Sequence, residues 1–302
     1  MSVEVLDLHF LEQPSLIASF LVHNGDEVAL VESGPGSTLP HLTAALAVHG
    51  LSPADITHLF LTHIHLDHAG GAGWLAQQGA TVYVHERGAR HLINPERLLA
   101  SATRVYGEDK MDVLWGDMLS IPEEKVVILQ DGDTVQAAGH TWTALDTPGH
   151  AYHHLAYLTD AGDCFTGDVG GCCLPGYDHI RVPTPPPDLD LGAWKTSITK
   201  LLEHKPERLF VTHFGERTNG VTHLERLRVN LDALTTWMEE QWNAGLSREE
   251  MIAGYWDWIA EQAHADNVDE DGIHLYQFVA GATGCVDGYR RYFKKQQQEK
   301  GE

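Results

Sequence analysis

The sequence is poor in the features that mark membrane, secreted and nucleic-acid-binding proteins. It has no run of about 18 apolar residues, the length that a membrane-spanning helix needs. Its first ten residues, MSVEVLDLHF, hold no basic segment followed by an apolar stretch, so no signal peptide is expected. Four cysteines in 302 residues do not suggest a disulfide framework. These absences predict a cytoplasmic protein that does not bind a membrane.

Basic side chains are also scarce. The chain has 20 Lys and Arg against 43 Asp and Glu, which gives a formal net charge of -23. Nucleic-acid binding needs clustered Lys and Arg to neutralise phosphates. The few small clusters, at 87–90, 226–228 and 290–295, are typical of solvated helix faces. We therefore expect a small-molecule substrate and no nucleic-acid partner, and a homodimer is left open.

Histidine, in contrast, is plentiful, and three of the 20 stand close together in the stretch LFLTHIHLDHAGG. With one aspartate they form the pattern H-x-H-x-D-H, which is made by His63, His65, Asp67 and His68. Alternate side chains of an extended chain point the same way, so His63 and His65 share one side. Asp67 and His68 stand where a helix would start and can face a neighbouring point. Converging imidazole and carboxylate groups of this kind predict a site for one or two divalent metals.

The same stretch carries a family resemblance. THIHLDHAGG resembles the signature of the metallo-β-lactamase-fold superfamily, especially its glyoxalase II-like hydrolases. Four further stretches match in the right order: VESGPG (31–36), TPGHAYHH (147–154), FTGDVGG (165–171) and VTHFGE (211–216). The resemblance extends over about residues 3–218. It implies an α/β fold, a four-layer αβ/βα sandwich, with a helical insert and a helical C-terminal extension.

The resemblance also implies a complete set of metal ligands. Three would hold a first metal, three a second, and one carboxylate would bridge them: His63, His65 and His150; Asp67, His68 and His213; and Asp168. The cofactors would be two divalent ions, with zinc as the first choice and manganese or iron as alternatives. Asp67 would also be catalytic, since it can orient the attacking hydroxide or pass a proton to the leaving group.

The hydrophobic periodicity by itself predicts mixed α and β structure. Strands are expected at 4–9, 17–23, 27–31, 57–62, 81–84, 126–129, 134–136, 141–145, 155–158, 164–166 and 208–212. We divide the chain into a catalytic domain, residues 1–221, and a helical extension packed on it, residues 222–302. The domain includes a largely helical insert at about 94–120, whose Val105 and Val113 are expected to make apolar contacts. Helices are expected in the extension at 223–243, 247–261 and 287–298.

Other residues are candidates for supporting roles. Metal-bound imidazoles usually donate their second N–H to a carboxylate or carbonyl, and Glu32 and Asp55 are candidates for that carboxylate. His153 and His154 are candidates for the pocket, and Tyr106, Tyr177 and Arg181 for substrate contact. The remaining candidates are better interpreted as packing or ordinary residues: Cys172, Cys173, His58, His85, His179 and His223.

These observations predict a dinuclear metal-dependent hydrolase, in which a metal-bridging hydroxide attacks a small ester, thioester or lactone. Two alternatives stay open. One is a phosphodiesterase of the same fold, because the same metals activate phosphoryl centres. The other is a persulfide dioxygenase, which resembles this fold but uses one iron held by two histidines and an aspartate. A non-catalytic metal-binding module is disfavoured by the complete ligand set.

Overall fold

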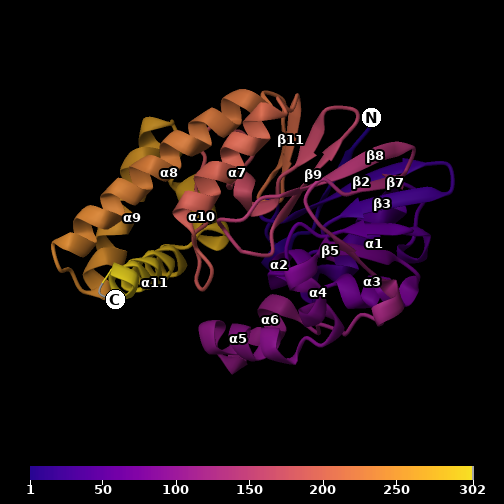
Figure 1. Cartoon of the computed structure of the whole chain (residues 1–302), viewed down its shortest axis with the longest axis horizontal. Helices are drawn as coiled ribbons and strands as arrows, with labels where there is room; N and C mark the ends of the chain where they lie inside the picture. Colours follow the sequence, from indigo (N-terminus) through magenta and orange to yellow (C-terminus); the bar gives the residue numbers. More distant parts are fainter. Residues whose placement is uncertain (301–302) are drawn as a thin grey trace.

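The computed structural model describes residues 1–300 and consists of two six-stranded sheets between layers of helices (Figure 1). The first sheet has the order β1-β2-β3-β4-β5-β6 and the second the order β12-β11-β10-β9-β8-β7. The strands of the first sheet are Glu4–Asp7, Ala18–Asn24, Glu27–Val31, His58–Phe60, Thr81–His85 and Val126–Leu129. Those of the second, in chain order, are Thr134–Ala137, His140–Asp146, Leu155–Thr159, Asp163–Phe165, Arg208–Val211 and Gly215–Arg217.

Helices cover the outer face of each sheet. Strands β3 to β6 run parallel, so the chain must cross back between them, and it does so through helices. These helices are α1 (Leu39–Val48), α2 (Leu66–Ala69), α3 (Ala72–Gln78), α4 (Glu86–Ile93), α5 (Glu96–Tyr106) and α6 (Glu108–Trp115). On the opposite side, α7 (Leu191–Glu203) and α8 (Gly220–Asn243) pack against the second sheet. The expected four-layer αβ/βα sandwich is confirmed.

The two sheets meet through aromatic side chains. Phe60 stacks on Trp142 with ring centroids 4.7 Å apart, and Trp142 stacks on Phe165 at 5.1 Å. Phe165 in turn stacks on Phe210 at 4.8 Å. All four rings are buried, and aromatic burial of this kind contributes strongly to a core. The stack fixes the ends of β4, β10 and β11 relative to one another, and the candidate ligands follow those ends.

The C-terminal part is helical, as predicted, but has one more helix than predicted. After α8 come α9 (Arg248–Ala265), α10 (Glu270–Val279) and α11 (Ala282–Lys300). Helix α9 begins with a capping box, in which Ser247 Oγ accepts from Glu250 N at 3.2 Å and Glu250 Oε2 accepts from Ser247 N at 2.8 Å. Helices α9 and α11 pack on each other and lie at the left of Figure 1, beyond α8. The division of the chain at residue 221 stays a prediction.

The helical insert is present as α5 and α6, but part of its expected packing is wrong. Trp115 is buried, and Met111 and Leu114 pack on the core of the first sheet. Val105 and Val113 are instead 59% and 66% exposed, because they lie on the outer faces of their helices. In the part of the chain that the structure describes, no helix combines the length and the apolar composition needed to cross a membrane.

Candidate metal centre

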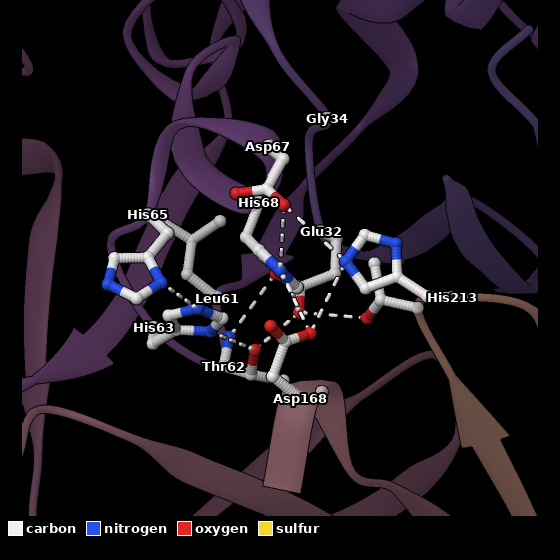
Figure 2. Close-up of polar contacts among 12 residues, drawn as sticks. Glu32, Gly34, Leu61, Thr62, His63, His65, Asp67, His68, Asp168 and His213 are labelled. Carbon is white, nitrogen blue, oxygen red and sulfur yellow. Dashed lines mark hydrogen bonds and ion pairs between the residues drawn. The ribbon is translucent and has the colours of Figure 1, made fainter. Parts of the chain in front are cut away.

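The seven predicted ligands lie in segments that follow strands of both sheets, and Asp67 and His68 belong to the short helix α2. The motif after β4 supplies four of them, and the others follow β8, β10 and β11. The structure brings all seven together, and Figure 2 shows six of them converging on one point: His63, His65, Asp67, His68, Asp168 and His213. The seventh, His150, reaches the same place from the loop after β8.

Three imidazoles form one half of the centre. His65 Nδ1 lies 2.9 Å from His63 Nε2 and 2.9 Å from His150 Nε2. Nitrogens bound tetrahedrally to one zinc ion, at Zn–N distances of about 2.0–2.1 Å, lie about 3.3 Å apart. The three rings therefore need only small shifts to hold one ion.

The other half contains two imidazoles and a carboxylate. Asp67 Oδ2 lies 3.4 Å from His213 Nε2 and 3.6 Å from His68 Nε2. Asp67 is about a quarter exposed at its side chain, whereas His68 and His213 are buried. Asp67 is therefore the member of this half that solvent or a substrate reaches most easily.

Asp168 stands between the two halves. Its Oδ2 lies 3.2 Å from His150 Nε2, in the first half. Its Oδ1 lies 3.2 Å from His68 Nε2 and 3.4 Å from His213 Nε2, in the second half. One carboxylate thus directs one oxygen to each half, which is the geometry that a bridging ligand needs.

The second nitrogen of each buried ring has its own acceptor. His150 Nδ1 lies 2.9 Å from Pro183 O, and His213 Nδ1 lies 2.7 Å from Leu16 O. A carbonyl oxygen only accepts, so each Nδ1 carries the hydrogen and donates it. The arrangement turns both Nε2 atoms inward, as in metal sites where a backbone carbonyl orients the ligating ring.

Glu32 orients the ring of a candidate ligand in the same way, but through its side chain, as the sequence predicted. Its Oε1 accepts from His68 Nδ1 at 3.0 Å and from Thr62 Oγ1 at 2.5 Å (Figure 2). Thr62 Oγ1 donates its only hydrogen to Glu32. The same oxygen therefore accepts a hydrogen bond from His63 Nδ1 at 3.0 Å. The matching prediction for Asp55 is wrong, since Asp55 is exposed and caps a short helix through Ser52.

Burial and charge set different protonation states in the two halves. Burial and the neighbouring imidazoles hold the pKa of His63 well below its usual value, and burial lowers that of His65 to about 3. In the second half burial opposes charge, but Asp67 and Asp168 outweigh it and raise the pKa of His68 and His213. Burial acts to raise the pKa of Asp67, yet His68 and His213 bring it down to about 2. The first half thus offers neutral imidazoles, whereas the second half holds ionised carboxylates beside imidazoles that favour their protonated forms, so a metal ion that binds there would displace protons.

Two buried atoms of the centre have no hydrogen-bond partner. They are His68 Nε2 and Asp168 Oδ1, which lie 3.2 Å apart without forming a hydrogen bond to each other. Buried polar atoms in proteins almost always have a partner, and exceptions call for an explanation such as an ion. The residues present therefore fit divalent metal ions.

Other predicted candidates divide into two groups. His154 and His153 flank the first half, with ring centroids 5.0 and 6.1 Å from that of His63. Tyr106, the last residue of α5 in the helical insert, is 40% exposed, and its ring packs edge-on to Trp115 with centroids 5.0 Å apart. The second group makes its side-chain hydrogen bonds outside the seven ligands and contains Cys172, Cys173, Tyr177, Arg181, His58, His85, His179 and His223.

Sequence reasoning missed the threonines of the centre. Thr62 links His63 to Glu32, and Thr212 Oγ1 lies 3.4 Å from the same Glu32 oxygen. Each threonine directly precedes a candidate ligand, in the dipeptides Thr62-His63 and Thr212-His213. That repetition is the signal that could have identified them.

Comparison with known proteins identifies the family. The model of the metallo-beta-lactamase superfamily matches residues 13–213. The chain belongs to this superfamily. It is 28% identical over 189 residues to the metallo-beta-lactamase fold-containing protein ST1585 of Sulfurisphaera tokodaii, covering 59% of this chain and 70% of that protein. It is 32% identical over 171 residues to a hydroxyacylglutathione hydrolase of Synechococcus, covering 55% of each.

Solved structures agree on the fold. The metallo-beta-lactamase family protein TTHA1429 of Thermus thermophilus superposes with a TM-score of 0.68 at 21% identity, over 98% of this chain and 94% of that one. At this identity the likeness supports the architecture alone. The chain spans only about half the length of several curated relatives, including hydroxyacylglutathione hydrolases.

Replacing Glu32 tests how the centre is held. Glu32→Gln removes the charge that receives His68 Nδ1 and Thr62 Oγ1, and loss of such an orienting group typically lowers metal affinity about 10–100-fold. We expect a loss of this size in a competition between the protein and a zinc chelator. Glu27→Gln, at the exposed start of the strand that precedes Glu32, is the control and should match the unmodified protein. Equal zinc retention by both variants would contradict the role given to Glu32.

Proposed function

We propose that this protein is a hydrolase that uses two divalent metal ions to cleave a small ester, thioester or lactone. The observation that carries the proposal is the position of Asp168, whose two oxygens face different groups of imidazoles. A single ion would leave one of these groups, and one buried carboxylate oxygen, without a partner. Membership of the superfamily and the likeness to hydroxyacylglutathione hydrolases favour an acyl substrate.

Different residues of the chain would hold the two ions. One ion would be held by His63, His65 and His150, the other by Asp67, His68 and His213, and Asp168 would serve both. Zinc is our first choice, with manganese or iron as alternatives, because imidazole and carboxylate ligands accept all three. When bound, two such ions supply an acidified water and polarise the carbonyl group that is attacked.

Asp67 is the residue to which we assign proton handling. It is ionised, since its pKa is about 2, and it is the most exposed member of its half. A carboxylate in that position can orient a water and then carry its proton to the leaving group. Tyr106, the candidate for substrate contact at the end of α5, is protonated at neutral pH like an ordinary tyrosine, so its hydroxyl can donate a hydrogen bond to a bound substrate.

The number of metal ions is the first test of the proposal. At saturation we expect about two equivalents in the unmodified chain and about one in both His150→Ala and His213→Ala, since each removes a ligand of one half. His58→Ala is the control, because His58 bonds to Thr57 away from the centre and should leave two ions. A single equivalent in the unmodified chain, kept in His213→Ala, would rule out the dinuclear centre.

Activity is the second test. Against a panel of ester, thioester, lactone and phosphodiester substrates, we expect turnover of an acyl compound without oxygen uptake. Asp168→Asn should lower kcat by roughly 10²–10⁴, the scale of a lost general-base or charge-stabilising group. The exposed Asp160→Asn, whose partner is His140, should leave kcat unchanged. Phosphodiester turnover alone, or oxygen uptake with a persulfide and one iron, would replace the proposal by one of its alternatives.

A further inference from the structure

A small cavity lies outside the metal centre, where segment 179–182 meets helices α8 and α9. Its volume is about 50 Å³. Its polar walls include Arg181, Asn230, Tyr255, Trp258, Gln262 and Asp266. A cavity needs about 10–15 Å³ by this measure to hold one water, so this one offers room for three or four water-sized groups.

Arg181 is the buried charge of this cavity. It is only 4% exposed, and its Nη2 donates to Ala280 O at 2.5 Å. Its Cζ lies 5.8 Å from the ring centroid of Tyr255, close enough for a cation–π contact. Its Nη1 is buried and has no hydrogen-bond partner. Two N–H groups of a guanidinium ion are therefore left unpaired beside an internal space.

The carboxylate in the cavity wall does not supply the missing partner. Asp266 lies after the end of α9 and is about one-third exposed, so it stands at the outer side of the cavity. Its Oδ2 lies 2.8 Å from His179 Nδ1, and its Oδ1 lies 3.8 Å from Arg226 Nη2. Asp266 is thus paired with His179 and Arg226, and Arg181 has no carboxylate partner.

Two arginines elsewhere in the chain have the carboxylate partner that Arg181 lacks. Arg208 holds Asp163 with both Nε and Nη2, at 2.6 and 2.7 Å. Arg248 holds Asp287 in the same way, also at 2.6 and 2.7 Å. Both are more exposed than Arg181, yet each has a two-pronged carboxylate partner.

A buried, unpaired charge is costly, and arginine cannot avoid the cost by losing its proton. We propose that the cavity binds a small anion, of about the size of chloride, formate or phosphate, that pairs with Arg181. Larger anions such as nucleotides do not fit the volume. Asn230, Trp258 and Gln262 carry side-chain N–H groups that can donate further hydrogen bonds to the anion. One N–H of Asn230 already donates to Ile180 O at 2.7 Å.

The site is joined to the metal centre through the backbone. Arg181 and Cys172 exchange two backbone hydrogen bonds, each of 2.8 Å. The next residue, Cys173, donates to His213 O at 2.5 Å. An anion on Arg181 would therefore anchor the segment against which the backbone of a candidate ligand rests, and it would stabilise the folded chain by mass action.

Bromide tests the site directly. Crystals of the metal-loaded protein grown in sodium bromide should show an anomalous peak within about 3.5 Å of Arg181 Nη1, a normal contact distance for a charged hydrogen bond to a halide. Crystals that show only water in the cavity would overturn the proposal. This readout uses the unmodified chain, so it does not depend on whether a variant folds.

Thermal unfolding supplies the matched comparison. Chloride, bromide and phosphate should each raise Tm in a saturable way above the value in sodium gluconate of equal ionic strength, because gluconate is too large for the cavity. Arg181→Met should lose this dependence, whereas Arg290→Met should keep it, since Arg290 stacks on Trp242 at 5.4 Å and bonds to Leu246 O. Equal anion responses of the two variants would also overturn the proposal. Metal content, measured in the same samples, tests the metal centre separately.

Discussion

The buried carboxylate of Glu32 is the interaction on which the candidate centre depends. One of its oxygens is shared by His68, Thr62 and Thr212. Through these contacts it connects the end of β3, the ligand motif after β4 and the segment after β11, and so joins both sheets. Glu32 holds this position with a φ of 64°, a conformation that a residue with a side chain adopts only when its surroundings enforce it.

In the proposed dinuclear centre, one fold would prepare two kinds of metal site side by side. Three histidines of the first half are kept neutral by burial, which leaves their lone pairs free. The second half adds a carboxylate of its own, and Asp168 lies against both. A carboxylate placed between the halves would offset the mutual repulsion of two cations, so Asp168 would matter more to the proposed centre than any single imidazole.

Much of this arrangement could be predicted from the sequence, because short motifs carry it. The H-x-H-x-D-H pattern follows a strand and begins a helix, so its geometry is local, and Glu32 stands in a recognisable turn. Contacts to backbone atoms, such as those of His150 with Pro183 O and His213 with Leu16 O, leave no trace in residue types.

The errors have physical causes as well. Helix α10 is only ten residues long and contains Gly272, so its periodicity is weak, although Asp269 marks its start by accepting from Gly272 N at 2.9 Å. Asp55 is a capping residue, which sequence alone does not separate from an orienting carboxylate. Arg181 is buried by α9 and by the residues that follow α10, and only the folded chain shows that it lacks a counter-ion.

The most direct test of the central claim is anomalous diffraction from crystals of the metal-loaded protein, measured on both sides of the absorption edge of the bound metal. Two peaks are expected. One should lie among His63, His65 and His150 and the other among Asp67, His68 and His213, with Asp168 between them. A single peak at full loading, or a second peak away from these residues, would contradict it.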